Sequence, residues 1–422
     1  MLARYQEQLN QLQSGLAKGI ASGDSECAEA MRDLVETVTV FRDPSRIGGV
    51  EVEMAGRLTA LLGEGAFPHG TKGVGGMVVA GDRSLRFQHS HVPISPWLAM
   101  SALQKGIRRG DVDLATRAAA TLLKDDPAKL WRRLIGIVFE DVGLASVETI
   151  RLVMTATSGK TIRQQFGGEW AIASLLVKQM CAARKCRAAD DLFLAISHHH
   201  ELEALRADLA RETTAERLSR VQGRGALLGA SLAALHASGA RWTGQVEGQT
   251  ANPNAMFAAM RPAGIDDDLV SLAEQGWKRT REALPILLAL VTLARPAGVL
   301  PVADDEFPPV VIARNGLPTY CLDRFSREGG ATLSRFLKRN TATSRWLRSH
   351  VPTNRRLAVL AGGLFRVEGG LVRQRVEWPC AMTLRWLADT GFHQMKLSDP
   401  AGFLDMIRAD LPALNEVRYD VR

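Results

Sequence analysis

Residues 98–143, LAMSALQKGIRRGDVDLATRAAATLLKDDPAKLWRRLIGIVFEDVG, predict three short helices in succession. Met100, Leu103 and Ile107 recur at steps of three and four, so they share one apolar face of the first helix. Gly110 follows at a position that suits a C-cap, because glycine readily adopts the left-handed conformation that ends many helices.

Polar caps begin the second and third helices. Asp111 or Asp113 begins the second, and Asp126 before Pro127 is a cap followed by proline at the first helical position. The third helix is expected to end near Gly143. The apolar positions of these two helices are Val112, Ala115, Ala119 and Leu122, then Leu130, Leu134, Ile137 and Val138.

The composition is that of a globular protein with a basic balance. The 422 residues are 46% hydrophobic and 23% charged, and this length favours two or three domains. The formal net charge is +8 with a pI near 9.5. A nucleic acid or another polyanion is therefore the favoured kind of partner.

The five cysteines are scattered and odd in number, which argues against a disulfide framework and for a reducing, cytoplasmic setting. The chain has no Cys-x-x-Cys pair, so a zinc ribbon is not expected. The opening residues are polar and amphipathic rather than signal-like. The longest apolar run, residues 283–294, is too short to span a bilayer, so no membrane partner is expected.

The first 64 residues predict a helical seam followed by a β-hairpin. The seam consists of Leu2, Tyr5, Leu9, Leu12 and Leu16, and a second helix is expected at about residues 25–36. The hairpin is expected where valines alternate with polar residues, at Val38 and Val40 and then at Val50, Val52 and Met54.

The stretch MRDLVETVTVFRD…GGVEVEMAGRLTALLG resembles the C-terminal tail of large serine recombinases. The resemblance covers roughly residues 1–64. It implies a tail used for contacts, without the family's catalytic domain. An unrelated helix–hairpin module is the alternative. A glycine-rich segment, residues 65–94, comes next in the chain and is predicted to be a linker.

Three further segments resemble the collar of the RarA/MgsA family of AAA+ ATPases, which act at stalled replication forks. They are SALQKGIRRGDVDLAT at Ser101–Thr116, WRRLIGIVFEDVG at Trp131–Gly143, and EWAIASLLVKQMCAARKCRAADDLFLA at Glu169–Ala195. The resemblance covers residues 95–196 and implies self-assembly in a DNA-maintenance context.

The nucleotide site of that family is not expected here. No GxxxxGK[ST] motif occurs, and Gly159-Lys160-Thr161 has Met154 where the first glycine should be. The same stretch is predicted to follow a helix, whereas a phosphate-binding loop is delivered by a strand.

The segment from residue 335 to residue 375 holds ten basic residues and one acidic residue, Glu368. Arginines with interleaved aromatics suit phosphate neutralisation and base stacking. The alternative is a solvated basic face, or arginines paired with the acidic stretches 266–268 and 304–306. The candidate nucleic-acid-binding residues are Arg335, Lys338, Arg339, Arg345, Trp346, Arg348, Arg355, Arg356, Arg366, Arg373 and Arg375.

Other candidate chemistry is weaker. His198, His199 and His200 are adjacent, and neighbours on a helix point about 100° apart, so they do not share one ion easily. The run Asp304–Glu306 has carboxylates suited to Mg²⁺, although an exposed loop is the better interpretation. We therefore predict no catalytic residue, no metal and no cofactor.

These patterns predict a mainly α protein. The expected parts are an α+β module at 1–64, a linker at 65–94, a collar-like helical bundle at 95–205, and a mostly helical region with minor strands at 206–422 that carries the basic segment 335–375.

The function expected from the sequence is a non-catalytic, nucleic-acid-associated accessory or oligomeric scaffold in DNA recombination, repair or replication, in a mobile-element context. Its expected partners are DNA or RNA, replication or recombination proteins, and further copies of the chain. The alternatives are a metal-dependent nuclease with its site in the C-terminal half, and a protein–protein adaptor in a defence or regulatory complex.

Overall fold

A computed structural model describes residues 35–42, 50–56, 94–223, 226–244 and 251–421. The chain divides into two compact units, Met1–Gln88 and His89–Arg422, and each is described by itself. The helices expected before residue 35 and the glycine-rich segment up to residue 93 lie outside the described residues.

The first unit contains the predicted hairpin. Strand β1 (Val35–Arg42) pairs antiparallel with β2 (Val50–Gly56). Val38 lies opposite Met54 and Val40 opposite Val52, which is the pairing that the alternating pattern requires.

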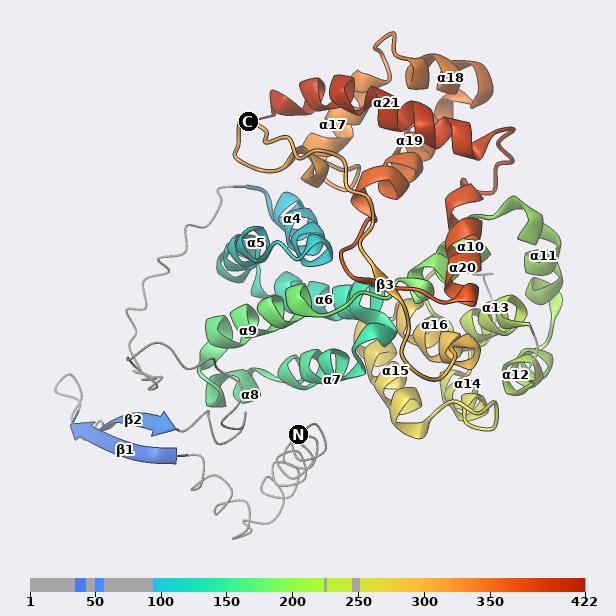
Figure 1. The fold of residues 1–422 in the computed structure, drawn as a ribbon. Coiled ribbons are helices and arrows are strands. Elements are labelled where there is room, and N and C mark those ends of the chain that lie inside the picture. Colours follow the sequence, from blue (N-terminus) through green and yellow to red (C-terminus); the bar gives the residue numbers. More distant parts are fainter. Residues whose placement is uncertain (1–34, 43–49, 57–93, 224–225, 245–250, 422) are drawn as a thin grey trace. The chain divides into compact units, whose positions relative to one another are not determined.

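The second unit is mainly α-helical, as the sequence predicts (Figure 1). Its first group of helices is α4 (Pro96–Arg109), α5 (Val112–Asp125), α6 (Pro127–Ile137), the π-helix η1 (Val138–Val142), the 3-10 helix η2 (Gly143–Ala145), α7 (Val147–Ala156), α8 (Lys160–Gln165) and α9 (Gly168–Ala182).

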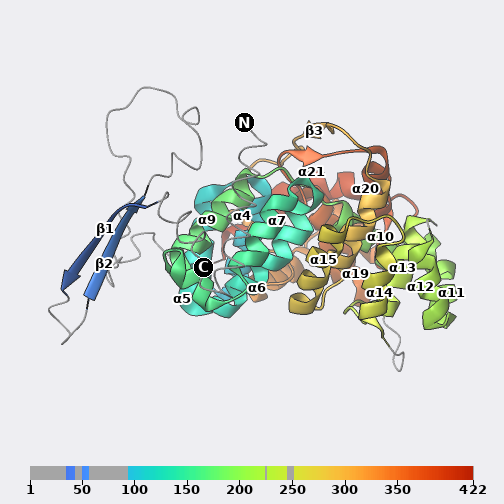
Figure 2. The ribbon, with the colours of Figure 1, turned by 90° about the horizontal axis from the view of Figure 1, so that it is seen from below.

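The second group is α10 (Ala188–His198), η3 (His200–Leu202), α11 (Glu203–Arg211), α12 (Thr214–Gln222), α13 (Leu227–Ser238), α14 (Pro253–Met260), α15 (Asp267–Thr280), α16 (Leu284–Val291) and η4 (Thr292–Ala294). In Figure 2, α11–α14 lie at one end of this unit and α5 and α9 at the other.

The third group is β3 (Val302–Ala303), η5 (Thr319–Cys321), α17 (Arg327–Phe336), α18 (Ala342–His350), η6 (Thr353–Arg355), α19 (Arg356–Leu364), η7 (Phe365–Gly369), β4 (Arg375–Val376), α20 (Pro379–Thr390) and α21 (Pro400–Tyr419). Strand β3 pairs antiparallel with β4.

The predicted caps are confirmed. Gly110 ends α4 with φ 67°, and its N–H donates to the carbonyls of Gly106 and Ile107. Asp111 caps α5 by accepting from the Leu114 N–H at 3.0 Å, and Asp126 caps α6 in the same way. Each cap satisfies a backbone donor or acceptor that a helix end leaves free.

One large apolar core crosses the boundary expected near residue 205, so the fold does not place two separate cores there. Leu103 of α4, Leu192 of α10, Leu288 of α16 and Leu384 of α20 belong to the same buried cluster. Helix α10 packs on both α16 and α20. The collar-like helices therefore share their core with helices of the C-terminal half.

A second, smaller core lies between α17, α18, α19 and α21, at the top of Figure 1. Phe403 stacks on Trp346 at 4.6 Å between ring centroids and meets Phe392 edge to face at 5.6 Å. The C-terminal basic segment is thus carried by helices that share a core of their own.

Two short segments of the C-terminal half have irregular surroundings. Residues 310–313 form only a single bridge, between Ile312 and Pro318, because the chain turns back at Gly316, which has φ 78°. Helix α14 is capped by Asn252 and begins with a proline.

Gly143 occupies a position that only glycine fits. Its φ is 51°, and a Cβ added there would overlap the carbonyl oxygen of Cys186. Gly136, seven residues earlier, lies inside α6, where an added Cβ would meet nothing closer than Glu282 Oε2 at 3.9 Å.

We expect Gly143→Ala to lower the free energy of unfolding by about 2–4 kcal/mol, since it combines left-handed strain with a backbone clash. Gly136→Ala is the matched control and should stabilise the protein by about 0.5–1 kcal/mol, because alanine favours a helix. Chemical denaturation of both variants measures the difference, and equal effects would contradict this account of Gly143.

Candidate nucleic-acid interface

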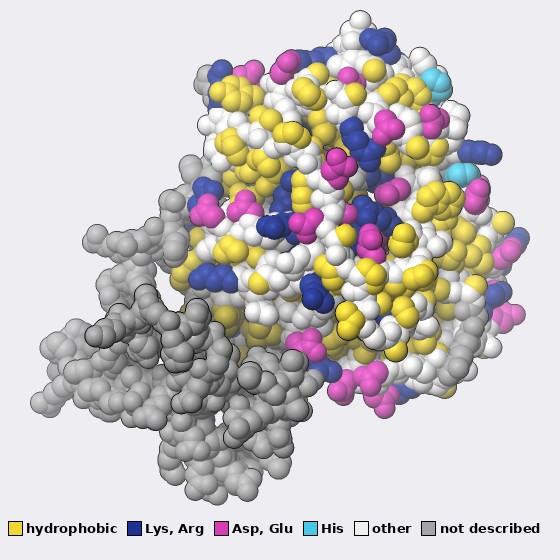
Figure 3. Space-filling model, viewed as in Figure 1, with side chains coloured by type: hydrophobic (Ala, Val, Ile, Leu, Met, Phe, Trp, Pro, Cys, Tyr) yellow, Lys and Arg dark blue, Asp and Glu magenta, His cyan; other side chains and the backbone are white. Residues whose placement is uncertain are grey.

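The basic residues predicted from the sequence divide into exposed and buried sets. Those exposed on the smaller core are Arg335, Lys338, Arg339, Arg345, Arg348 and Arg355. They lie on α17, α18 and η6 or directly after them. Basic and acidic side chains are interspersed over the face shown in Figure 3, so the net charge is not a uniform positive coat.

The exposed cations differ in their partners. Arg339 pairs with Glu416 at 2.6 Å. Arg348 donates to the Leu337 carbonyl at 3.1 Å. The side chains of Arg335 and Lys338 form no hydrogen bond or ion pair with the part of the chain that the structure describes. These two are the most available for an external anion.

Trp346 and Arg356 are half-buried. The Trp346 ring stacks on His350 and on Phe403, each at 4.6 Å, and so attaches α18 to α21. Arg356 donates to the carbonyls of Val351 and Arg348 at 2.9 and 3.0 Å. Both side chains hold the helices in place rather than face solvent.

Arg366 and Arg375 are turned into the interior. Arg366 donates to the carbonyls of Gly362 and Gly391 and lies over the Phe392 ring at 4.5 Å. Arg375 has an exposed fraction of 6%. Neither side chain is therefore available at the candidate interface. Arg373 is exposed, but its main chain bonds to α4, away from the smaller core.

Exposed arginines also precede the predicted segment. Arg324 and Arg327 are also exposed and precede the predicted segment, and Phe325 between them is 73% exposed. From residue 324 to residue 356 the sequence has nine basic residues and one acidic residue, Glu328. That excess of basic residues was the signal that could have found them.

A buried network of charges lies at the centre of the larger core. Asp141, fully buried on η1, accepts from Arg108 Nε at 2.8 Å, from Gln104 Nε2 at 3.0 Å and from Arg187. Arg187 also pairs with Asp190. The EDVG stretch thus joins α4 to α10 through ionic hydrogen bonds.

The pKa values of the two buried carboxyls, Asp141 and Asp190, are shifted in opposite directions. Burial alone would raise the pKa of Asp141, but the charges of Arg108 and Arg187 hold it below its ordinary value. For Asp190 burial prevails over the Arg187 charge, and with the repulsion of Glu140 it raises the pKa to about 7. Asp190 thus takes up a proton near neutral pH.

The carboxylates of Asp304 and Asp305, which the sequence leaves as alternative Mg²⁺ ligands or as part of an exposed loop, have partners within the protein. Asp305 binds Arg375 through Nη2 at 2.7 Å and Arg385 through Nη2 at 2.9 Å. Asp304 accepts from the Gln374 N–H at 2.7 Å. The Asp305 side chain is therefore a buried ion-pair partner, whereas Asp304 and Glu306 beside it are exposed as predicted.

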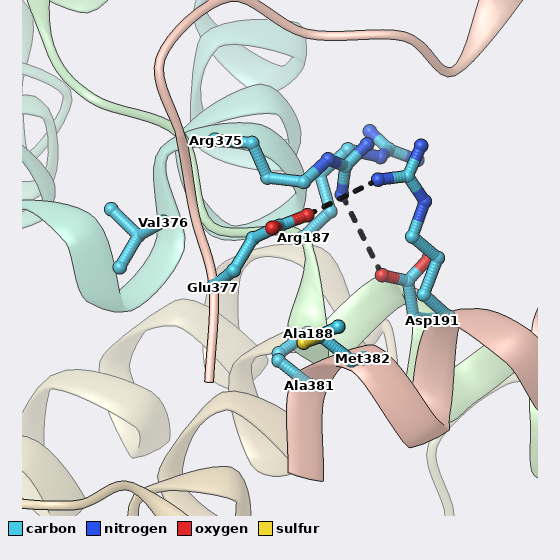
Figure 4. A pocket seen from close by; sticks show the side chains of 9 residues that line it. Arg187, Ala188, Asp191, Arg375, Val376, Glu377, Ala381 and Met382 are labelled. Atoms are coloured by element: carbon cyan, nitrogen blue, oxygen red, sulfur yellow. Dashed lines mark hydrogen bonds and ion pairs between the residues drawn. The ribbon is translucent and has the colours of Figure 1, made fainter. Parts of the chain in front are cut away.

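A pocket adjoins this second charge cluster (Figure 4). Arg375 and Asp191 face each other across it at 3.8 Å, and Ala188 and Met382 contribute apolar atoms. Its volume of about 10 Å³ is far below the ~300–1,000 Å³ of typical ligand pockets. The pocket is a gap between ion pairs and not a site for a drug-sized molecule.

The remaining sequence features concern a phosphate-binding loop, a metal site and a membrane-spanning helix. Lys160 begins a six-residue helix that follows α7, so no strand delivers a phosphate loop there. Among the described residues, no group of three or more His, Cys, Asp or Glu side chains is placed to hold a metal ion. Within the same residues, every helix is too short or too polar to cross a membrane.

We expect Asp141→Asn to destabilise the protein by about 3–5 kcal/mol, because it leaves Arg108 and Arg187 buried with too little negative charge. Asp405→Asn, which breaks an exposed pair with Arg408, is the control and should cost at most about 1 kcal/mol. Thermal or urea unfolding compares them, and a small effect at Asp141 would show that the network is dispensable.

The stability of the protein should depend on pH through Asp190. Its pKa is about 7 in the folded chain and about 3.9 in an unfolded one, so the folded state holds the proton more tightly. This contribution to stability is fully present below pH ~4 and is lost as the pH rises towards ~7. Asp190→Asn should therefore flatten the decline of unfolding free energy between about pH 4.5 and 7, as measured by urea denaturation at several pH values.

The exposed Asp208→Asn provides the matched control for that experiment, because Asp208 lies at the surface beside Arg211. It should leave the pH profile unchanged. An identical slope in the wild type and in Asp190→Asn would contradict the assignment.

Comparison with known proteins identified no matching family model, no similar curated protein and no similar solved structure.

Proposed function

We propose that this chain binds nucleic acid through the exposed cations of residues 324–355, which we call the basic face, and acts as a non-catalytic accessory or scaffold in DNA recombination, repair or replication. The basic face consists of Arg324, Arg327, Arg335, Lys338, Arg339, Arg345, Arg348 and Arg355. Within the described residues, only Arg339 among these eight has a carboxylate partner. This imbalance of charge is the observation that carries the proposal.

Three of these cations lie close together along the chain. Arg327 and Arg335 are on α17, and Lys338 is two residues after its end at Phe336. Unpaired cations on one short segment can neutralise successive phosphates, and each neutralised phosphate releases condensed counterions. Binding through the basic face would therefore be strongly salt-dependent.

The basic face rests on a packed support. Leu333, Phe336 and Leu347, all buried, fix α17 and α18 on the smaller core. Phosphate contacts fix register and orientation when they come from elements that are themselves held in place. The cations of α17 are in this way presented from a rigid surface and not from a loop.

The biological setting rests on the two resemblances. If the collar-like and recombinase-tail-like segments share the roles of those families, this protein assembles with copies of itself near DNA ends or forks. Self-association is accordingly part of the proposal.

The test is a salt-titrated binding assay with a fluorescent oligonucleotide, duplex and single-stranded. In the triple variant Arg327→Gln, Arg335→Gln and Lys338→Gln, no described hydrogen bond is lost, so folding should be preserved. We expect weaker binding and a slope of log affinity against log salt that is less steep by about 2–3, at about 0.9 for each lost contact on duplex DNA.

The matched control is Lys178→Gln with Arg184→Gln, which removes exposed cations on and after α9. Its salt slope should equal that of the wild type. Absent binding, or equal losses in both variants, would contradict the proposed role of the basic face. Arg348 and Arg356 are not suitable targets because both donate to backbone carbonyls.

A further inference from the structure

A phenylalanine stands out from the surface directly before α17, the helix at the top of Figure 1. This residue, Phe325, has an exposed fraction of 73%. Single exposed apolar residues are common on protein surfaces, so exposure alone does not indicate a function. The surroundings of the Phe325 ring are what point to one.

The backbone that carries Phe325 is part of a tightly bonded turn. Its N–H donates to Asp323 Oδ1 at 2.9 Å. The next residue, Ser326, is buried and caps α17 by accepting from the Gly329 N–H at 3.0 Å. Gly329 packs directly on this turn, since a Cβ added there would overlap the Asp323 carbonyl oxygen. The ring therefore projects from a backbone that is held in place.

Asp323 attaches this turn to the larger core. Its carboxylate accepts from Ser101 Oγ at 2.9 Å and pairs with Lys105. Both of these residues are buried on α4. A binding group on a pre-ordered backbone loses less conformational freedom when a ligand binds, and this favours affinity. The Phe325 ring is thus exposed to solvent on a support that is already ordered.

Two exposed arginines lie beside the ring. The Arg324 guanidinium is 5.6 Å from the centroid of the Phe325 ring, and Arg327 is the first residue of α17. Neither guanidinium forms an ion pair or a hydrogen bond with the described part of the chain. An aromatic face next to unpaired guanidinium groups combines a surface for stacking with donors for phosphate.

The other aromatic rings of the basic segment are already covered. Between residues 324 and 356 the sequence has two more phenylalanine or tryptophan residues, Phe336 and Trp346. Phe336 is 2% exposed and belongs to the smaller core. The Trp346 ring stacks on His350 and on Phe403, each at 4.6 Å. Of the three, Phe325 alone has its ring available to a ligand.

The geometry points to Phe325 as a stacking surface for an unpaired base, and so to single-stranded nucleic acid as the ligand of the basic face. This inference rests on the proposed function and narrows it. In a duplex, neighbouring bases cover both faces of each base, so a side chain must first unstack a step. In a single strand a base can stack on Phe325 while Arg324 and Arg327 bind phosphates beside it. DNA and RNA strands offer the same chemistry here.

The test is a fluorescence-anisotropy titration of the full chain with labelled thymidine and uridine oligomers and with a duplex. Phe325→Leu keeps an exposed apolar side chain and the backbone bond to Asp323 but removes the aromatic face. We expect the wild type to prefer single strands, and the variant to bind them at least about fivefold more weakly. Duplex affinity should not change. The loss should be the same at every salt concentration, because stacking neutralises no phosphate.

Three controls separate stacking from other effects. Phe166→Leu makes the same change at an exposed phenylalanine after α8 and should leave binding unchanged. Phe325→Trp restores an aromatic face and should bind single strands at least as tightly as the wild type. An abasic strand keeps the phosphates without bases. It should bind the wild type more weakly than the thymidine oligomer does, and Phe325→Leu should weaken it no further.

The outcomes distinguish this inference from the proposed function. If nucleic acid binds but Phe325→Leu behaves like Phe166→Leu, or if the duplex is preferred, the stacking role is overturned and the proposed function stands. If neither strands nor duplex bind, both fail. A loss confined to single strands supports the stacking role, and the oligomer that shows the larger loss, thymidine or uridine, identifies DNA or RNA as the source.

Discussion

The buried carboxylate of Asp141 is the constraint on which the arrangement of the larger core depends. It is fully buried and accepts hydrogen bonds from Gln104, Arg108 and Arg187, so three side chains must meet it at once. A buried charge without such partners would be strongly destabilising. The backbone carbonyl of Asp141 also accepts from the Cys186 N–H at 3.0 Å, which brings the chain before α10 against Gly143 and excludes a side chain there.

The network continues outward from Asp141 to the C-terminal segments. Arg108 also donates to the Gly369 carbonyl at 2.6 Å, and Glu368 beside it pairs with Arg418 at 2.8 Å. These contacts fix η7 and α21 relative to α4. The position of the smaller core therefore depends on ionic contacts with the larger one, and so does the direction in which α17 presents its cations.

Much of the local structure could be predicted because its causes are local. Gly110, Asp111 and Asp126 end or begin helices through bonds to residues three or four positions away. The hairpin in the first unit follows from alternation alone. The core that crosses residue 205 could not be predicted, because it depends on contacts between helices far apart in sequence.

The residues of the candidate interface also divide into those that the sequence predicts and those whose position depends on distant contacts. In sequence, Arg335 and Arg375 are equivalent members of one basic segment. In the fold Arg375 pairs with Asp305, seventy residues earlier, whereas Arg335 finds no carboxylate among the described residues. The composition of a segment gives the number of its charged residues, but not which of them form ion pairs in the fold.

Pairing also explains why α17 and α18 keep exposed arginines without carboxylate partners. Carboxylates on η1, α10, α20, η7 and the β3–β4 connection pair with buried arginines. Glu169 on α9 does the same for Arg163. The helices α17 and α18 contribute one acidic residue, Glu328, so their arginines remain uncompensated. The basic face is thus a set of arginines and one lysine for which the fold supplies a single carboxylate, that of Glu416.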